Sequence, residues 1–489
     1  MPTDERAVVE GVEVSTDHLI GGRRLGSPTR FTDVSPIDEQ VIAEVGRADA
    51  ATVDAAVVAA HRAAADWGRT PPKDRAAVLH RIADGVEARI DDLSVVETRD
   101  NGSLLRSHRN SVMPRVARNF RFFADKLLEL DDAGGMTFNG NDERVTWDPS
   151  GVTAVIGPWN APLMLATWRI APALAAGNAV VHKPPEWAPL TASLLGDIAL
   201  EAGLPAGAYN VVQGIGEEAG AALVAHPGVT RIAFTGSVQT GRLVAAAAAA
   251  NLTPTSLELG GKSPFLIFAD ADPDAALRQA VGQFDNAGQV CLAGTRLLIE
   301  TSIYDDFLER FVDATGRVVQ GDPRDETTDI GPLISREHFE RVDGFVRAGH
   351  AEGANALVGG GPNDDLGGLY YRPTLFVDMP EGSPLLTREI FGPVLTAQPF
   401  RDEAEAITLA NRTDYGLAAT VYTGDEARAR RVGEQLVAGT VWVNCFFVRD
   451  LDAPFGGSRN SGIGREGGRW SFDFYADVKN VVTAPSSGG

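Results

Sequence analysis

The chain has 489 residues, of which 44% are hydrophobic and 22% are charged, and its formal net charge is −22. These values describe an ordinary globular protein that is longer than one hydrophobic core usually supports, so we expect two or three domains. A surface this acidic repels nucleic acid and anionic membranes, so we expect neither as a partner.

The sequence contains no recognisable targeting or membrane segment. It has no run of about 18 apolar residues to span a bilayer, and no basic stretch followed by an apolar one near Met1. Cys291 and Cys445, its two cysteines, lie far apart and offer neither a disulfide framework nor zinc-ligand spacing. We therefore expect a cytoplasmic protein without a metal centre.

The first third of the chain predicts short strands followed by helices. The strands are expected at 17–20, 30–34 and 41–45, and the helices at 49–67, 73–90, 92–101 and 111–130. Glycine-rich turns then surround a strand at 144–147. This helical region is expected to cover a sheet.

From Gly151 onward, apolar strands alternate with helices. The first run has strands at 152–156, 179–182, 209–212 and 231–234, separated by helices at 163–176, 189–202, 217–225 and 240–251. A second run has strands at 264–267, 296–300, 375–377, 420–422 and 440–444, a helix at 275–284, a loop at 359–369, a glycine-dense segment at 454–468 and a last strand at 479–484. The alternation predicts parallel, doubly wound α/β sheets, in which ligands bind beyond the carboxyl ends of the strands.

Polar residues follow two of these strands. Asn160 comes just after 152–156, where its amide could stabilise an oxyanion, or it is simply a turn asparagine. Lys183 and Glu186 follow 179–182 and would suit ribose hydroxyls, and the carboxylate would repel a 2′-phosphate, which favours NAD over NADP. A surface turn explains the same pair equally well.

Two further strand ends carry candidate residues. Gly236 and Ser237 precede a predicted helix, whose N-terminus favours phosphate, although the spacing is not the dinucleotide fingerprint. Glu258, before two glycines, could act as a general base or could be a solvated turn carboxylate.

Cys291 is the strongest nucleophile candidate, because a thiolate is reactive where its pKa is lowered and its approach is open. Gly288 and Gly294 flank it and would let the backbone come close to a bound molecule. The alternative is a buried cysteine that fills space. Cys445 is the rival nucleophile, but it has no glycine beside it.

Seven short motifs occur together and in order. They are Pro158-Trp159-Asn160, Lys183-Pro184-Pro185-Glu186, Phe234-Thr235-Gly236-Ser237, Glu258-Leu259-Gly260-Gly261-Lys262, Gly288-Gln289-Val290-Cys291, Glu389-Ile390-Phe391-Gly392-Pro393 and Pro454-Phe455-Gly456-Gly457. The set resembles the NAD(P)-dependent aldehyde dehydrogenase superfamily across nearly the whole chain.

This resemblance implies a three-part α/β fold. Residues 1–128 and 150–256 would form a Rossmann-type NAD-binding domain and 257–440 an α/β catalytic domain. Residues 129–149 and 469–489 would form a small β oligomerisation arm, and 441–468 a return segment that lines the substrate entrance. A homodimer or homotetramer is implied.

The resemblance also implies roles for individual residues. Cys291 would attack an aldehyde, Asn160 and the Cys291 N–H would hold the oxyanion, and Glu258 would activate water, which favours hydrolysis over transfer to coenzyme A. The NAD site would be formed by Ile156, Trp159, Lys183, Glu186, Gly216, Gly236, Ser237, Leu259, Glu389 and Phe391.

Residues 113–123, 444–451 and 473–475 resemble the muconate-type semialdehyde dehydrogenases, namely the hydroxymuconic, carboxymethyl-hydroxymuconic and aminomuconic enzymes. In that group two arginines are thought to clamp the substrate carboxylate, which here implies Arg115 and Arg449. Alternatively, Arg449 pairs with Asp450 and Arg115 is solvated. The expected function is NAD-dependent oxidation of a carboxylated unsaturated semialdehyde from aromatic ring cleavage. A broad-specificity or betaine-type enzyme is the alternative, and a catalytically silent binding or structural relative is a third hypothesis.

Overall fold

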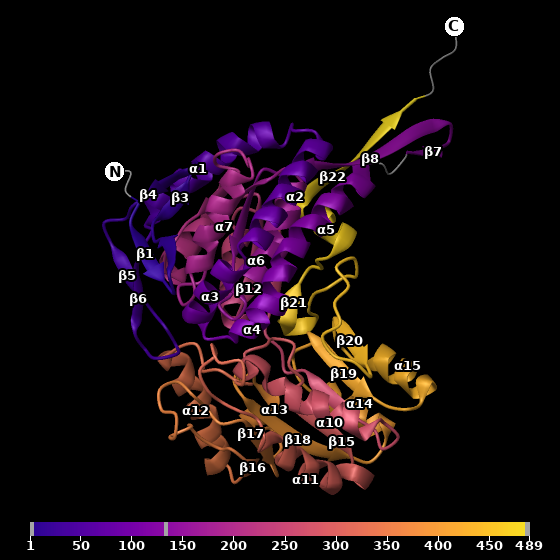
Figure 1. The fold of residues 1–489 in the computed structure, drawn as a ribbon. Helices are drawn as coiled ribbons and strands as arrows, with labels where there is room; N and C mark the ends of the chain where they lie inside the picture. The colour runs from indigo at the N-terminus through magenta and orange to yellow at the C-terminus, as the bar shows by residue number, and fades with distance from the viewer. Residues whose placement is uncertain (1–3, 132–134, 485–489) are drawn as a thin grey trace.

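The computed structural model describes residues 4–131 and 135–484, which form two large sheets and one small one. Figure 1 shows the first large sheet, with its indigo-to-magenta helices, in the upper half and the second, in orange, below it. The predicted α/β class with parallel sheets is confirmed. The sequence-based expectations for residues 1–3, 132–134 and 485–489 concern positions outside the described residues.

The first large sheet has eight strands, of which the inner five are parallel. In sheet order they are β21 (Gly462–Ile463), β13 (Thr255–Leu259), β12 (Arg231–Gly236), β9 (Val152–Ile156), β10 (Ala179–Lys183), β11 (Tyr209–Val211), β3 (His18–Ile20) and β4 (Arg23–Leu25). The edge strands run antiparallel to their neighbours.

Helices cover both faces of this sheet because its central strands are apolar on both sides. Val155 of β9 points into one core, whereas Ala154 and Ile156 point into the other, as the two-residue period of a strand requires. The first core is closed by α2 (Pro72–Ala88), α3 (Ile90–Asn101), α5 (Met113–Asp131), α6 (Pro162–Ala175) and α7 (Leu190–Glu201), and the second by α1 (Ala50–Trp67), α8 (Ala221–Ala225) and α9 (Val238–Ala249).

The second large sheet has seven strands, and all of them are parallel except the edge strand β16. In order they are β16 (Asn355–Val358), β17 (Thr374–Val377), β18 (Val394–Phe400), β15 (Arg296–Glu300), β14 (Pro264–Ile267), β19 (Ala418–Tyr422) and β20 (Thr440–Val443). Its helices are α10 (Pro273–Val281), α11 (Tyr304–Thr315), α12 (Arg336–Ala351), α13 (Pro384–Thr387), α14 (Glu403–Ala410) and α15 (Glu426–Gln435).

A three-stranded antiparallel sheet projects away from the rest of the molecule (Figure 1). It consists of β22 (Ala476–Thr483), β8 (Asn141–Pro149) and β7 (Met136–Phe138), so the C-terminal strand pairs with a segment more than three hundred residues earlier. Met136, Phe138 and Val482 are large apolar side chains exposed on it.

The remaining elements are short or peripheral. They are β1 (Arg6–Val9), β2 (Val12–Ser15), β5 (Arg30–Val34), β6 (Val41–Gly46), α4 (Leu105–Ser107), α16 (Gly468–Tyr475), the π-helices η1 (His108–Val112) and η2 (Gly216–Gly220), and the 3₁₀ segments η3 (Gly282–Gly288), η4 (Thr301–Ile303) and η5 (Arg459–Ser461). No helix in residues 4–131 or 135–484 is long and apolar enough to cross a membrane.

Two local features differ from the sequence-based expectations. The helix expected at 275–284 ends at Val281, because Asp285, Asn286 and Ala287 leave helical geometry. The strand β13 was not predicted, and Glu258, for which a solvated turn was the alternative to a general base, lies buried inside it. Most helices of the second half, from α11 to α16, had not been expected.

Candidate active site

The expected functional residues gather at the carboxyl ends of the strands in the eight-stranded sheet. Strand register places Ile156 beside Lys183 on one side and beside Phe234 on the other. One residue further along, Thr235 of β12 pairs with Glu258 of β13. These chain segments, far apart in sequence, therefore end at one edge, where an α/β sheet binds its ligands.

The loop that carries Cys291 has an unusual backbone. Asn286, Ala287 and Gly288 follow one another with φ of 50°, 54° and 69°, in the left-handed region that ordinary residues seldom adopt. A Cβ on Gly288 would lie 2.2 Å from the Gly392 carbonyl oxygen, so only glycine fits there. Gly294 likewise packs on the Phe265 ring. These glycines serve contacts within the protein rather than the ligand approach expected from the sequence.

Asn160 reaches the same loop from the turn between β9 and α6. Its Nδ2 donates to the Gln289 carbonyl at 2.9 Å, and Asn286 Nδ2 donates to the Asn160 carbonyl at 3.3 Å. An amide nitrogen carries two hydrogens, so one remains to be directed at a reacting oxygen. The Asn160 side chain therefore contacts the backbone at Gln289, which is two positions before Cys291 in the chain.

The Cys291 thiol does not have the lowered pKa that favours a free thiolate. Burial, followed by the charges of Glu389 and Glu258, raises the pKa of Cys291 to about 12, because each of these effects disfavours the thiolate. The side chain is half-buried. At neutral pH it is therefore a thiol, and a base must take its proton when it reacts.

Glu258 is a buried carboxyl group suited to that task. Its side chain is 6% exposed, and within the described chain Oε1 has no hydrogen-bond partner. Burial and, next to it, the charge of Glu466 raise the pKa of Glu258 to about 8. The absence of a side chain at Gly456 leaves room for the Glu258 carboxyl group, because a Cβ at position 456 would lie 2.9 Å from Glu258 Oε1. A carboxyl group that titrates near neutral pH can accept and release protons.

Glu466 was not identified from the sequence, where it sits inside the glycine-dense segment 454–468. It is fully buried, and its Oε1 accepts hydrogen bonds from Arg169 Nε at 3.1 Å and from Ser256 Oγ at 2.8 Å. Backbone pairing with Phe455 fixes its place in the segment. The charge of Arg169 lowers the pKa of Glu258, whereas the charge of Glu466 raises it.

Lys183 and Glu186 form an ion pair at the end of β10. Lys183 Nζ lies 2.6 Å from Glu186 Oε2, and Glu186 Oε1 accepts the Gly216 N–H at 3.4 Å. Lys183 is 2% exposed, and burial lowers its pKa while the Glu186 charge opposes that change. The pair presents a donor and an acceptor side by side, which matches the hydroxyls of a ribose.

Ser237 is the N-cap of α9. Its Oγ accepts the Thr240 N–H at 3.1 Å, so the helix begins at Val238, two residues earlier than expected. Gly236 ends β12 and must be glycine, because a Cβ would lie 2.5 Å from the Phe234 ring. Leu259 packs on the same helix at Gly241. An exposed serine and a free helix N-terminus suit a phosphate.

Glu389 and Phe391 approach this region from the segment before β18. Glu389 Oε1 accepts the Gly261 N–H at 2.9 Å, and burial raises the pKa of Glu389 to about 7. Phe391 has a φ of 61° and its ring meets the Trp159 ring edge-on, with centroids 5.2 Å apart. His338 Nε2 contacts the Phe391 carbonyl at 2.7 Å. The structure adds His338 to the residues expected from the sequence.

Arg115 and Arg449 lie against the same side chain, Trp168. The Cζ atom of Arg115 is 5.6 Å from the Trp168 ring centroid, and that of Arg449 is 5.0 Å from it. The two Cζ atoms therefore lie no further apart than the sum of these two distances. Arg449 also stands 3.7 Å above the Phe455 ring. Burial, together with the charge of Arg449, lowers the pKa of Arg115 to about 10. Both arginines remain cationic at neutral pH.

Neither arginine has an acidic partner within the residues that the structure describes. The Asp450 carboxylate accepts the Asp452 N–H at 3.0 Å instead of pairing with Arg449. Arg115 is half-buried rather than solvated. The simpler explanations of these two arginines therefore receive no support. Both cations lie at the Trp168 ring, and neither forms an ion pair with a described residue.

Cys445 follows β20 and packs against the apolar cluster of Leu292, Leu417, Ala418 and Trp442, as Cys291 does. Its neighbour Asn444 has a φ of 52° and bonds back to Thr423, which turns the chain sharply after the strand. Cys445 thus lies near the candidate nucleophile. The acid–base groups described above act on Cys291, whose pKa responds to Glu258 and Glu389.

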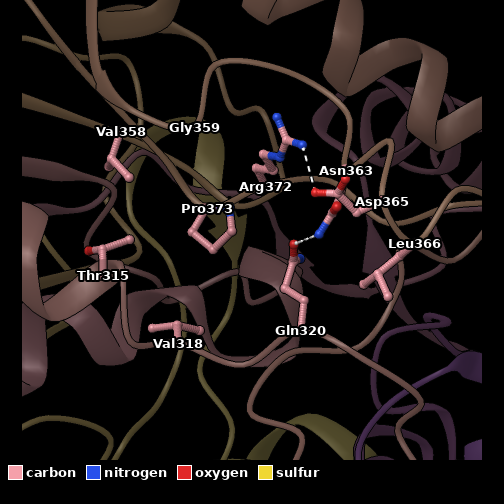
Figure 2. A pocket seen from close by; sticks show the side chains of 10 residues that line it. All are labelled: Thr315, Val318, Gln320, Val358, Gly359, Asn363, Asp365, Leu366, Arg372 and Pro373. Atoms are coloured by element: carbon pink, nitrogen blue, oxygen red, sulfur yellow. Dashed lines mark hydrogen bonds and ion pairs between the residues drawn. The ribbon is translucent and has the colours of Figure 1, made fainter.

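Figure 2 shows a surface cavity of about 280 Å³ elsewhere in the molecule. It lies between the end of α11 and the loop that follows β16, and none of the expected site residues lines it. Asn363 Nδ2 donates to Gln320 Oε1 at 2.9 Å, and Arg372 pairs with Asp365 at 3.3 Å. Its polar groups satisfy one another, and we assign it no role. No cluster of three or more His, Cys, Asp or Glu side chains able to hold a metal occurs among the described residues.

Several known proteins are similar to this chain in sequence and fold. The family model described as the aldehyde dehydrogenase family matches residues 25–481. A 2-hydroxymuconic semialdehyde dehydrogenase of Pseudomonas sp. (strain CF600) is 45% identical over 479 residues, which cover 95% of this chain and 98% of that protein. A 2-aminomuconic semialdehyde dehydrogenase of Danio rerio is 43% identical over 474 residues, with coverages of 95% and 97%. The crystal structure of a betaine aldehyde dehydrogenase from Staphylococcus aureus, in complex with NAD+, is 35% identical with a TM-score of 0.93, over 97% of this chain and 96% of that one.

Proposed function

This chain belongs to the aldehyde dehydrogenase family, and on that premise we propose that it oxidises a carboxylated, unsaturated semialdehyde of aromatic ring cleavage to the acid, with NAD. The observation that carries the proposal is the convergence of a thiol, an amide donor and a buried base on one point, with two unpaired arginines beside it. The relatives supply the class of aldehyde, since several of them are muconic semialdehyde dehydrogenases.

The strand-end residues fit NAD. The Lys183–Glu186 pair would hold the adenosine ribose, and the glutamate disfavours a 2′-phosphate. Ser237 and the N-terminus of α9 would receive the pyrophosphate. Glu389 with Phe391 would hold the nicotinamide end, next to Trp159. When bound, NAD supplies the acceptor for the hydride that leaves the substrate carbon.

The protein's own residues carry the covalent chemistry. Cys291 Sγ forms a bond to the aldehyde carbon, its proton passes to Glu258, and the carbonyl oxygen becomes an oxyanion. Asn160 Nδ2 and the Cys291 N–H donate to that oxygen, where charge develops. Loss of hydride from the carbon leaves a thioester on Sγ. Glu258 first releases the proton that it took from Cys291, and then takes a proton from a water molecule. The water oxygen attacks the thioester carbon and displaces Cys291 Sγ, which releases the acid.

The substrate's far end is assigned to Arg115 and Arg449. A guanidinium binds a carboxylate through two parallel hydrogen bonds, and a half-buried cation without an acidic partner gains most from one. Trp168 and Phe455 add apolar surface for an unsaturated chain. A cationic substrate such as betaine aldehyde would be repelled here, which disfavours the betaine-type alternative despite the similar fold.

Domain division and assembly complete the proposal. We assign cofactor binding to residues 1–128 and 150–256, catalysis to 257–440, and substrate access to 441–468, because each large sheet has its own cores. We assign assembly to residues 129–149 and 469–489. Within these ranges the projecting sheet of β7, β8 and β22 exposes Phe138, which is 64% accessible, and this apolar exposure suits a homodimer or homotetramer.

Replacing either arginine tests the substrate assignment. Arg115→Leu and Arg449→Leu should each raise KM for 2-hydroxymuconic semialdehyde about 10- to 100-fold, because a charged hydrogen-bonded pair is lost. KM for the neutral phenylacetaldehyde should stay within about twofold, since no carboxylate is involved. Steady-state NADH formation at saturating NAD measures both.

Arg118→Leu is the matched control. Arg118 is exposed on the same helix, and its charge is felt by Arg115, so its loss removes a nearby cation without removing the clamp. Its KM for the acidic aldehyde should change little. If the Arg115 and Arg449 variants kept the wild-type preference for the acidic aldehyde, the clamp would be refuted and a broad-specificity enzyme favoured.

Glu466→Gln should shift the pH profile of kcat to lower pH. The charge of Glu466 raises the pKa of Glu258, so its removal lets Glu258 ionise, and act as a base, at a lower pH. Glu466→Asp keeps the charge and should keep the wild-type profile. Measurement of kcat between pH 6 and 10 compares the variants, and identical profiles would show that Glu466 does not tune the base.

A further inference from the structure

Asn119 is a buried polar residue that connects Arg115 to helix α6. It lies one helical turn after Arg115 on α5 and is 1% exposed. Its Oδ1 accepts the Arg115 Nε–H at 2.9 Å. Its Nδ2 donates to Thr167 Oγ1 at 3.1 Å and to the Met164 carbonyl at 3.2 Å, both on α6. Every hydrogen on the amide is used.

The hydrogen-bond network fixes which way the Asn119 amide points. The Thr167 hydroxyl has one hydrogen, and it donates this to the Met164 carbonyl at 3.1 Å. Thr167 Oγ1 can then only accept, so the nitrogen of Asn119 must face it. The oxygen is thereby directed at Arg115. If the amide were flipped, its oxygen would face the Met164 carbonyl and Thr167 Oγ1, which are both acceptors, and its nitrogen would face the Arg115 Nε–H, which is a donor.

This contact determines which part of Arg115 is available. Nε is occupied by Asn119, whereas no hydrogen bond or ion pair of the two terminal nitrogens occurs within residues 4–131 and 135–484. The guanidinium plane is also placed against Trp168, with Cζ 5.6 Å from the ring centroid. The end of the guanidinium that carries Nη1 and Nη2 is therefore left to bind a carboxylate through both nitrogens.

We propose that Asn119 is a positioning residue that orients Arg115 for end-on, two-point binding of the substrate carboxylate. The inference rests on the proposed function and adds to it a chain of three side chains, from Thr167 through Asn119 to Arg115. Arginine loses much side-chain freedom when it is held in one geometry, and a buried partner supplies that order before the substrate arrives.

A merely structural role predicts a different outcome. If Asn119 only tied α5 to α6, its loss would affect every substrate alike, through stability. If Asn119 orients Arg115, its loss affects aldehydes with a carboxylate and spares neutral ones. The ratio of kcat/KM for the two kinds of aldehyde is therefore the informative readout.

The test compares Asn119→Leu with the wild type on 2-hydroxymuconic semialdehyde and phenylacetaldehyde. Leucine has nearly the same shape and removes both the acceptor and the donors. We expect KM for the acidic aldehyde to rise about tenfold, with kcat and the neutral aldehyde nearly unchanged. Thr167→Val, which removes the acceptor that orients the amide, should raise the same KM by a smaller factor.

A double-mutant cycle with Arg115→Leu shows whether Asn119 acts through Arg115. In that background Asn119→Leu should have no further effect on the preference for the acidic aldehyde. Thermal unfolding of each variant, followed with and without NAD, separates a loss of fold from a loss of specificity. Thr167→Val keeps the proposal testable where Asn119→Leu does not fold.

The outcomes separate this inference from the proposed function. If Asn119→Leu and Thr167→Val both kept the wild-type preference for the acidic over the neutral aldehyde, the role of Asn119 would be overturned and the proposed function would stand. An equal loss on both aldehydes would also overturn it, in favour of a structural tie. A wild type without preference, with Arg115→Leu and Arg449→Leu also without effect, would overturn the proposed function and this inference together.

Discussion

Replacement of Cys291 by alanine is expected to abolish aldehyde oxidation, with kcat lowered by at least about 10⁴-fold. In the proposed mechanism the Cys291 thiol forms the covalent adduct that the oxyanion donors and the base serve. Asn160 contacts its loop at Gln289, and the carboxylates of Glu258 and Glu389 act on its pKa. Without sulfur no thioester forms, so hydride transfer has no covalent adduct from which to start. NADH production over a panel of aldehydes measures the loss.

Cys445→Ala is the matched control, because Cys445 packs against the same apolar cluster and is the other free cysteine. It should keep activity within about twofold, because Cys445 takes no part in the proposed chemistry and alanine is a small apolar replacement for it. Binding of NAD to the Cys291→Ala protein should be retained, which separates a catalytic defect from unfolding. Activity that survives in Cys291→Ala and disappears in Cys445→Ala would reverse the assignment. A wild type that binds NAD but oxidises no aldehyde would support a silent relative.

The sequence predicted the strand framework well because strands in buried parallel sheets are short apolar runs with glycine or proline after them. The strands β9, β14 and β15 have the predicted bounds. The family, the fold class and the aldehyde-oxidising activity are confirmed. The placement of individual residues in the site stays a prediction, supported by contacts such as that of Asn160 with Gln289.

Other features could not be read from the sequence, for physical reasons. Local patterns do not report contacts between distant segments, so Trp168, which brings Arg115 and Arg449 together, gave no signal. Glu466 lies in an irregular glycine-rich segment, where burial has no periodicity. The raised pKa of Cys291 depends on burial by several chain segments, which the type of residue and its neighbours in sequence do not reveal. Gly288 was recognised as important, but its partner is the Gly392 backbone rather than a ligand.

Glu258→Gln should lower steady-state kcat by about 10²- to 10⁴-fold, which is the usual contribution of a general base. Glutamine has the same shape and accepts no proton at any accessible pH. The wild-type rate should rise with pH through about 8, because the pKa of Glu258 is raised to about 8 by burial and by Glu466, and only the ionised form above that pH is a base. In the variant this rise should disappear from the steady state.

The two steps served by Glu258 respond differently to pH in this variant. Acylation needs loss of the Cys291 proton, and because the pKa of that thiol is raised to about 12, hydroxide can substitute for the missing base only as pH rises. A rapid-mixing experiment should therefore show a burst of NADH that is slow at pH 7 and faster at pH 10. Hydrolysis of the thioester still lacks its base, so the acyl adduct should accumulate and be visible on Cys291 by mass spectrometry. A variant with no adduct and an unchanged steady state would assign water activation to another group, and Glu389, the other carboxylate that raises the Cys291 pKa, would be the residue to replace next.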